Sequence, residues 1–506
     1  MHTIPYVRDS SLTTPTLIHH VNLFSLTGLR RPVGSPHMTF FGMSQRQYAT
    51  LKKDGFSGVQ SHVMLTPSGK KCKKVGLQLS AAGILKPAQL LTKAKKWKKK
   101  GYLCGTIMIG TGDETREEAL DIAKHILEVS EEVEIPLYLE LHRGTVTQNI
   151  SAVLEMIKAY PGLRFNADFS HYITAYRWCE TFNDKTLQHI MPILERVCYI
   201  HLRLSNSEHI QLSSAKTVEV NLYRFLLQTT FQLFRNNASA GDVLIVTPEL
   251  LPRFTGYAEV DRTETGHVEN SNRYNQCLEL QSFAKECFNT DSIVPFTPRE
   301  GCTDSIVPFT PREGCTDLNG TKIYPLFEIS DIADFQSLAT ENLKDAMFIR
   351  VALGDGLVEK EGQDKVMNTY LEAQRKDRRI CLETRRNTLT HSLQRTREIV
   401  AKHPDISLCL NLSEWVLGHE ITIDKIHRFR SNARSLGGIT LINPTYATAE
   451  HAYSKKKYRP WAYLSLCVIT EWLYTRFYHG VWNSINAPTM VTRKNANYAE
   501  LKHQEV

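Results

Sequence analysis

The feature that most constrains the fold is a regular alternation of short apolar segments with helical patterns, which begins near residue 38. Eight segments rich in Val, Ile, Leu and Phe are predicted strands: "MTFFGMS" (38–44), "GFSGVQ" (55–60), "VGLQLS" (75–80), "CGTIMIG" (104–110), "IPLYLEL" (135–141), "LRFNADFS" (163–170), "VCYIHLRL" (197–204) and "DVLIVTPEL" (242–250). The clearest helix between them is "DETREEALDIAKHILEVSEE" (113–132), with Asp113 as its expected N-cap. Eight strands alternating with helices over about 250 residues predict a parallel (β/α)8 TIM barrel. A doubly wound sheet is the alternative, but no G-x-G-x-x-G motif follows a strand.

A tandem repeat interrupts this pattern. The segment "TDSIVPFTPREGC" occupies 290–302 and recurs unchanged at 303–315, and its Pro, Thr and Gly content predicts an extended surface linker. Because 506 residues exceed one ordinary core, we expect a barrel over 1–288, a linker over 289–320 and a second α/β domain over 321–506. Five further strands are predicted in that last part: "IYPLFEIS" (323–330), "MFIRVAL" (347–353), "RICLETR" (379–385), "ISLCLNLS" (406–413) and "GITLINP" (438–444).

The second part resembles the first at a constant offset of 243 residues. "LELHRGTVT" (139–147) lies over "LETRRNTLT" (382–390), and "YPGLRFNADFSHY" (160–172) lies over "HPDISLCLNLSEW" (403–415). Two strand–helix–strand units of equal internal length predict an internal duplication, with the second copy an incomplete and degenerate TIM-barrel-like repeat. Chance similarity between two such units is the alternative.

Composition indicates a globular protein of the cytoplasm. The eleven cysteines form no C-x-x-C pair, which predicts reduced thiols and a cytoplasmic location. The late apolar segment 462–482 contains Glu471, Arg476 and His479, so a buried or amphipathic helix is expected there rather than a membrane span. The lysine-rich run "KAKKWKKKG" (93–101) is predicted to be a solvated helix face, with a nucleic-acid or phosphate-binding patch as the alternative. For the protein as a whole, neither nucleic acid nor a membrane is the expected partner. The oligomeric state is open, a homo-oligomer included.

Polar side chains gather where four consecutive predicted strands end. Functional residues of a parallel barrel project from the carboxyl ends of its strands, which here supply Glu140, His142, Asp168, His171, His201, Arg203 and Glu249. Carboxylates with an imidazole suit a divalent cation such as Mn²⁺, Mg²⁺ or Zn²⁺. The predicted ligands of one such ion are Glu140, Asp168, His201 and Glu249. Taken singly, each residue is as well explained by hydrogen bonds within the core.

At these residues the sequence resembles the sugar phosphate isomerase/epimerase family with the xylose-isomerase-like TIM barrel, which also includes nucleases of the endonuclease IV type. The resemblance covers roughly residues 38–285 and is most specific in "LYLELHRGTVTQNI", "LRFNADFSHY", "YIHLRL" and "TPELLPR". It implies a metal held by Glu140, Asp168, His201 and Glu249, and a substrate contacted by His171. Arg203 matches the basic residue that the family commonly has two positions after the metal histidine. The nucleases use a further Asp-x-His shortly after that histidine, and "HLRLSNSEHIQLSS" supplies none.

The expected reaction is isomerisation or epimerisation of a small carbohydrate. A sugar, sugar phosphate or polyol ketone would chelate the cation, which stabilises the enediolate formed when the α-proton leaves. Glu140 and Glu249 are the predicted acid/base groups, while His142, His171 and Arg203 would bind substrate. Loss of a β-hydroxyl would give instead the dehydration of an inosose-type substrate. The alternatives are an abasic-site nuclease of the endonuclease IV type and a non-catalytic barrel that binds a ligand or partner.

In the second copy the predicted ligand set is not preserved. Glu383 matches Glu140, but Arg385, Asn411 and Glu414 stand in place of His142, Asp168 and His171, and His201 falls near Asn443. An amide in place of a carboxylate removes an anionic ligand, and an arginine nearby repels a cation. We therefore expect this half to bind no catalytic metal and to act as a scaffold, a dimer surface or a cover for the first barrel.

Overall fold

The computed structural model describes the barrel almost completely and part of the second half. The described residues are 2–29, 36–39, 42–62, 65–263, 266–297, 326–329, 349–354, 360–377, 380–403, 406–409, 414–415 and 418. The chain divides into two compact units, one formed by 1–310 and 325–442 and the other by 311–324 and 443–506. All described residues belong to the first unit. The predicted strand 438–444, most of the tandem repeat and the late apolar segment 462–482 lie outside them.

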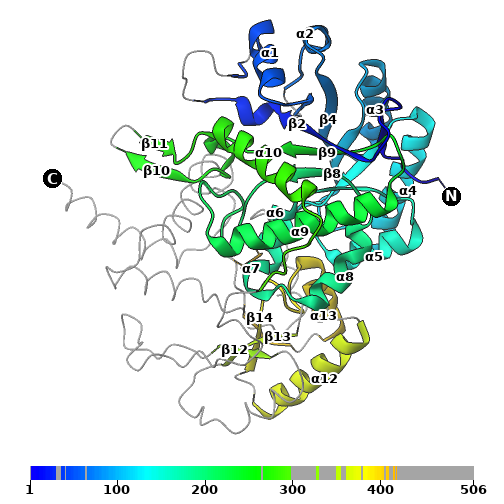
Figure 1. Ribbon diagram of the computed structural model, residues 1–506. Coiled ribbons are helices and arrows are strands. Elements are labelled where there is room, and N and C mark those ends of the chain that lie inside the picture. Colours follow the sequence, from blue (N-terminus) through cyan, green and yellow to red (C-terminus); the bar gives the residue numbers. More distant parts are fainter. Residues whose placement is uncertain are drawn as a thin grey trace, which may run out of the picture. The chain divides into compact units, whose positions relative to one another are not determined.

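Eight parallel strands close into a barrel (Figure 1). In order around the barrel they are β2 (Thr16–Asn22), β3 (Gly58–Gln60), β4 (Gln78–Leu85), β5 (Gly105–Ile109), β6 (Leu137–Glu140), β7 (Phe165–Ala167), β8 (Val197–Leu202) and β9 (Asp242–Pro248). Pairing of β9 with both β8 and β2 closes the ring, and the short β1 (Val7–Arg8) adds an antiparallel strand to β9. The fold is therefore the predicted (β/α)8 barrel.

Helices follow the strands and surround the ring. They are α1 (Gln45–Lys53), α2 (Gly69–Lys74), α3 (Leu90–Lys99), α4 (Arg116–Val133), α5 (Ile150–Ala159), α6 (Phe169–Tyr176), α7 (Trp178–Thr181), α8 (Asp184–Leu194), α9 (Thr217–Asn237) and α10 (Arg273–Asn289). Short 3-10 turns are η1 (Leu23–Leu26), η2 (Pro87–Gln89) and η3 (Arg253–Thr255), and a hairpin of β10 (Val260–Thr263) and β11 (Gly266–Glu269) precedes α10. Helices and strands share one continuous apolar core, as a barrel requires.

The first barrel strand differs from the prediction. The expected strand 38–44 is wrong, because its described residues form only isolated bridges, and the barrel begins instead with β2, "TLIHHVN". The sequence pattern did not reveal β2 as a strand, because its two adjacent histidines interrupt the run of apolar residues. His20 is nevertheless fully buried, with Nδ1 2.8 Å from Ser80 Oγ. Its ring lies against Gly58, where a Cβ atom would come within 2.4 Å of His20 Nε2, so only glycine fits there.

His20 predicts a loss of stability in acid. Burial lowers the pKa of His20 to about 4, so the unfolded chain binds this proton below about pH 6.5 while the folded chain does not. The contribution of His20 to the free energy of unfolding is thus complete above pH 6.5. It is lost as the pH falls toward 4, which lowers the free energy of unfolding by about 3 kcal/mol. Urea unfolding at pH 7 and pH 4.5 should show a smaller acid loss in His20→Asn than in the wild type. Equal losses in both proteins would contradict this role of His20.

Helix α4 begins two residues later than the predicted cap would place it. The N-cap is Thr115, not Asp113, because the Thr115 side chain accepts from Glu118 N at 3.2 Å while Glu118 Oε2 accepts from Thr115 N at 2.8 Å. This reciprocal capping box satisfies two N–H groups at once, which a lone aspartate would not do.

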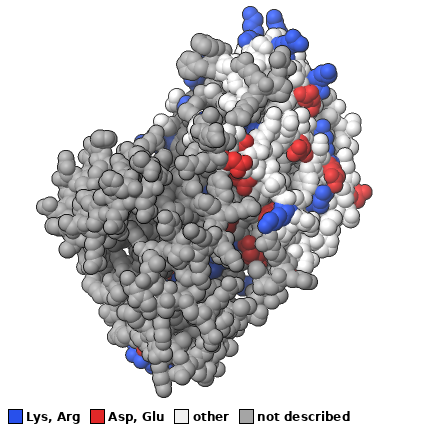
Figure 2. Space-filling view, turned by 90° about the vertical axis from the view of Figure 1, so that its left-hand side faces the viewer, with Lys and Arg blue, Asp and Glu red and all other residues white. Residues whose placement is uncertain are grey.

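The lysine-rich run forms the expected solvated helix face. In α3 the buried residues are Leu90, Ala94 and Trp97, while the lysines between them are exposed. Lys95 pairs with Glu132 of α4 at 2.7 Å. Other Lys and Arg side chains gather at the top of the face in Figure 2, at the level of α1 and α2 in Figure 1.

The second half contributes a four-stranded parallel sheet with its own core. Its order is β12 (Leu326–Ile329), β13 (Ile349–Leu353), β14 (Ile380–Glu383) and β15 (Leu408–Cys409). Helix α12 (Lys360–Lys376) connects β13 to β14, and α13 (Leu393–Lys402) connects β14 to β15. Four predicted strands are thus confirmed, whereas the domain boundaries and the duplication stay predictions. Among the described helices, none has the length and apolarity needed to cross a membrane.

Candidate metal centre

The four predicted ligands meet inside the barrel. Glu140 ends β6, Asp168 follows β7, His201 lies in β8 and Glu249 follows β9. Each offers one ligand atom, and these atoms all lie within 4.8 Å of one another. Glu140, Asp168 and His201 are fully buried, and Glu249 is 4% exposed. Parallel strands end at the same rim of the barrel, so residues far apart in the sequence converge there.

Arg203 lies beside this cluster and contacts two of its carboxylates. Its Nη2 donates to Asp168 Oδ2 at 2.5 Å and to Glu249 Oε2 at 2.7 Å. Burial lowers the pKa of Arg203, but the two carboxylates more than reverse this and keep the guanidinium charged. The sequence predicted a substrate-binding role for Arg203 and did not predict these ion pairs.

The imidazole of His201 is oriented by polar residues that the sequence analysis missed. Its Nδ1 faces Glu249 Oε2 at 3.3 Å and Glu140 Oε1 at 3.5 Å. Its Nε2 lies 3.1 Å from Gln60 Oε1 and 3.0 Å from Gln60 Nε2. Asn22 Nδ2 donates to Gln60 Oε1 and to Glu249 Oε1, each at 2.8 Å. A proton on Nε2 shared with Gln60 would leave Nδ1 free to bind a cation, a common arrangement of metal-binding histidines.

The remaining carboxylate of the cluster has an unused oxygen. Glu140 Oε2 accepts from Asn166 Nδ2 at 3.0 Å. Glu140 Oε1 is buried and has no hydrogen-bond partner in the structure. Its nearest cationic group is His201 Nδ1 at 3.5 Å, and burial of a carboxylate oxygen without a hydrogen bond is costly. With a neutral imidazole, three carboxylates and one guanidinium leave two negative charges, so the residues present fit a divalent cation.

The pKa shifts within the cluster indicate strong attraction between His201 and the neighbouring carboxylates. Burial lowers the pKa of His201, but Glu249 and Glu140 raise it to about 9 overall. Burial raises the pKa of Glu140, yet the neighbouring His201 brings it below its ordinary value. The cluster therefore favours a positive charge at its centre, and a cation that binds there must displace the proton of His201.

His142 and His171 lie together next to the cluster. Their ring centroids are 3.6 Å apart, and His171 Nε2 is 3.7 Å from Asp168 Oδ2. Burial, the neighbouring His142 and the Arg143 guanidinium hold the pKa of His171 well below its usual range, so the His171 ring is neutral. Tyr257 approaches the same region, with its ring 6.3 Å from His171.

The second half shows a different environment around the residue that matches Glu140. Glu383 is buried and accepts from Arg350 Nη1 at 3.1 Å. Glu414 pairs with Arg386 at 2.9 Å. Asn411 and Asn443 lie outside the described residues, so the expectation that this half binds no catalytic metal stays a prediction.

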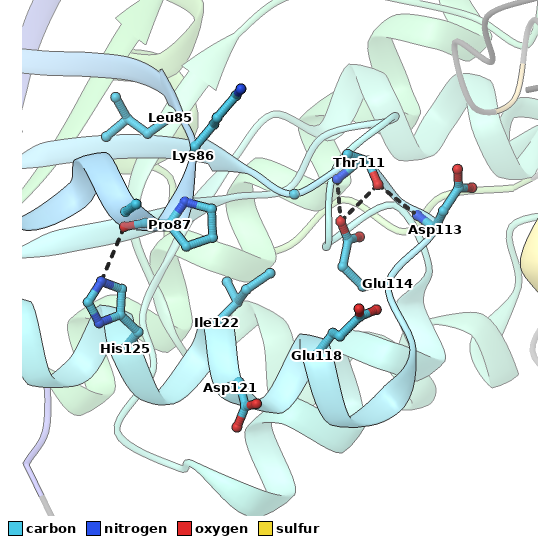
Figure 3. Close-up of a pocket in the computed structure, with 12 residues that line it drawn as sticks. Leu85, Lys86, Pro87, Thr111, Asp113, Glu114, Glu118, Asp121, Ile122 and His125 are labelled. Carbon is cyan, nitrogen blue, oxygen red and sulfur yellow. Dashed lines mark hydrogen bonds between the residues drawn. The ribbon is translucent and has the colours of Figure 1, made fainter. Parts of the chain in front are cut away.

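A cavity elsewhere on the barrel involves none of the predicted site residues. It has a volume of about 780 Å³ and is lined by the ends of β4 and β5 and by α4 (Figure 3). Both of its glutamates have local structural roles: Glu114 accepts from Thr111 N at 2.5 Å and from Gly112 N at 2.8 Å, and Glu118 caps α4. We assign no chemistry to it.

Comparisons with known proteins give similarity of fold alone. No family model matches the sequence, and no curated protein matches it. Similar solved structures include 3-keto-D-glucoside 4-epimerase from E. coli (12% identity, 54% of this chain and 100% of that chain, TM-score 0.33). A xylose isomerase-like TIM barrel protein from Mycobacterium smegmatis in complex with magnesium (12% identity, 54% and 97%, TM-score 0.36) and a probable 3-DHS dehydratase from Bacillus anthracis (11% identity, 47% and 94%, TM-score 0.32) are also similar. At these values the similarities support no argument about activity, which depends on the site itself.

Proposed function

We propose that the barrel is a divalent-metal-dependent isomerase or epimerase of a small sugar, sugar phosphate or polyol ketone. The observation that supports this most is the convergence of three carboxylates and an imidazole within 4.8 Å at the carboxyl ends of four adjacent strands. A bound Mn²⁺, Mg²⁺ or Zn²⁺ would act there as a Lewis acid toward adjacent substrate oxygens. The ligands would be Glu140, Asp168, His201 and Glu249.

Two carboxylates of this cluster would move the proton. One of Glu140 and Glu249 takes the proton from the carbon next to the carbonyl, which leaves an enediolate. Return of a proton to the opposite face of the same carbon gives the epimer, and return to the neighbouring carbon gives the isomer. Both routes conserve atoms and electrons, because the proton that is removed is replaced and no oxidant is needed. Loss of a β-hydroxyl as water would give a dehydratase by the same first step.

Neighbouring residues would orient the substrate. The neutral ring of His171 and the adjacent His142 supply hydrogen-bonding nitrogens for substrate hydroxyls. Arg203 Nε and Nη1 are buried and have no hydrogen-bond partner in the structure. A fixed guanidinium with unused donors would fit the developing negative charge of an enediolate oxygen.

Solvent hydrogen exchange tests the proposal without knowledge of the product. Protein loaded with Mn²⁺ and incubated in D₂O with a panel of ketoses and inososes should incorporate deuterium at the α-carbon of at least one of them, detected by NMR. Removal of the metal with EDTA should stop the exchange. An intact, metal-loaded protein that exchanges no α-proton across the panel would contradict proton-transfer catalysis.

One observation favours a second candidate, a non-catalytic barrel that binds a ligand or partner. Arg203 already spans Asp168 and Glu249 and neutralises part of their charge. If this guanidinium were the only cation the cluster needs, no metal would bind. Titration of the protein with Mn²⁺ separates the two candidates, since only the first predicts saturable binding.

A further inference from the structure

Arg386 of the second half occupies an unusual position for a charged side chain. It lies three residues after β14, and its side chain is only 1% exposed. Burying a guanidinium is costly unless its hydrogen bonds are satisfied. The acceptors that satisfy Arg386 come from both halves of the chain.

All five N–H donors of the Arg386 guanidinium have acceptors. Nε and Nη2 donate to the carboxylate of Glu414, at 2.9 and 3.3 Å. Nη1 donates to the backbone oxygens of Thr174, at 3.0 Å, and Ser207. Nη2 also donates to Glu208 Oε1 at 3.3 Å. The planar fork of arginine can make this set of contacts, and lysine cannot.

The acceptors in the barrel belong to the two segments that leave the candidate metal centre. Thr174 lies in α6, whose N-cap is the predicted ligand Asp168. Ser207 and Glu208 lie in the loop after β8, the strand that contains His201. The two segments also contact each other, because Thr174 Oγ1 donates to Asn206 O at 2.9 Å. Arg386 therefore joins the segments that follow two different ligands.

The equivalent arginine of the barrel makes a related contact near the site. Arg143, at the offset of 243 residues, directs its backbone N and its Nε toward His171 Nδ1 at 3.4 and 3.3 Å. Arg386 directs the same two groups toward Glu414 Oε2 at 3.2 and 2.9 Å.

The loops of the two arginines share a further feature. Thr147 Oγ1 donates to Glu140 O at 2.5 Å, and Thr390 Oγ1 donates to Glu383 O at 2.7 Å. The same loop geometry thus presents an arginine to the candidate site in one half and to the barrel's ligand-bearing segments in the other.

We propose that Arg386 is a positioning residue through which the second half of the chain holds Asp168 and His201 in place for metal binding. This inference rests on the proposed function for its metal, and on the contacts above for its geometry. A ring contact supports it, since Tyr176 at the end of α6 stacks on His391 with centroids 4.2 Å apart. The second half would then act on the site as a brace and not through a ligand of its own.

The test compares full-length variants by two measurements. Calorimetric titration gives the Mn²⁺ affinity, and hydrogen exchange with mass spectrometry follows the amides of residues 169–176 and 203–208. Arg386→Ala should weaken Mn²⁺ binding about tenfold, as loss of support behind metal ligands does, and should speed exchange in both segments. Arg386→Lys should restore part of each, because a lysine keeps the charge but not the fork.

A matched control removes another cation from the second half of the chain, at the end of α13. Lys402 pairs with Asp364 at 2.7 Å and is 57% exposed, so Lys402→Ala should change neither measurement. Wild-type Mn²⁺ affinity in folded Arg386→Ala, even with a lower melting temperature, would overturn the proposal. If Arg386→Ala does not fold, Arg386→Lys decides by the same two readouts. If the wild type binds no Mn²⁺, the proposed function fails and so does the positioning of ligands, while faster exchange in both segments would still show the brace itself.

Discussion

Glu249→Gln is expected to lower kcat by about a thousandfold or more while the protein stays folded. The substitution removes a proton acceptor, and general acid–base catalysis contributes about 10²–10⁴ in rate. It also replaces an anionic side chain that is a predicted metal ligand with a neutral one, which should bind the metal more weakly. The fold should tolerate the change, because a neutral amide is easier to bury than a carboxylate. The glutamine oxygen can still accept from Asn22 Nδ2, and Arg203, which loses its pair with Glu249, keeps its pair with Asp168. The measurement is turnover of the substrate identified by solvent exchange, with Mn²⁺ in excess of its dissociation constant.

A glutamate far from the site provides the control for Glu249. Glu286 of α10 is 61% exposed and pairs with Arg224 at 2.6 Å, so Glu286→Gln should keep wild-type kcat. Full turnover by a folded, metal-loaded Glu249→Gln protein would remove Glu249 from the acid/base pair. Glu140 would then be the remaining acceptor.

Asp168→Asn is expected to weaken Mn²⁺ binding by at least about a hundredfold and to abolish detectable turnover. The change replaces an anionic ligand with a neutral amide, and Mn²⁺ prefers carboxylate oxygens. It also leaves Arg203 with one carboxylate partner in place of two. The helix should survive, because Asp168 caps α6 by accepting from Ser170 N at 3.1 Å and asparagine is an equally good N-cap. Calorimetric titration with Mn²⁺ measures the loss.

Asp168→Asn also gives the barrel the residue that the second half has at the matching position, Asn411. The variant therefore tests whether an asparagine at this position is compatible with metal binding. Asp242 is the matched control, since it begins β9 at the opposite end of the strand from Glu249 and pairs with Arg8 at 3.2 Å. Asp242→Asn should bind Mn²⁺ as the wild type does. Equal Mn²⁺ affinity in Asp168→Asn and the wild type would mean that Asp168 is the partner of Arg203 only.

Much of the barrel could be predicted because its strands are buried on both faces. Such strands appear as continuous apolar segments, and seven of the eight expected ones are present. The expected strand 38–44 is not formed by its described residues. The barrel strand that the pattern missed is β2, in which His19 and His20 lie inside the core. The burial of a histidine depends on partners such as Ser80 and Gly58, which come from other strands. Local pattern cannot supply that information.

The convergence of the four candidate ligands could be predicted because strand ends share one rim. The residues that orient them could not. Asn22 and Gln60 are paired across β2 and β3, and their side-chain amides face the cluster. Both are neutral residues at the ends of their strands, so the search for charged side chains at strand ends did not find them. The ion pairs of Arg203 depend on rotamers that no spacing encodes. The metal-binding, catalytic and substrate-binding roles of all these residues stay predictions.

The second half could be predicted only as a series of strands. The offset of 243 residues matched the strand–helix–strand unit around Glu383, and the hydrogen bonds of Thr390 repeat those of Thr147. The contacts of Arg386 with the barrel involve backbone oxygens, which have no residue-type signal in a sequence. The cytoplasmic location and a homo-oligomeric state also remain predictions from the sequence.

The most direct test of the metal centre is the number and position of Mn²⁺ ions in crystals of the full-length protein grown with MnCl₂. We predict one anomalous scattering peak inside the barrel, bounded by the side chains of Glu140, Asp168, His201 and Glu249. Absence of density between these residues at saturating Mn²⁺, with Arg203 still spanning Asp168 and Glu249, would contradict it.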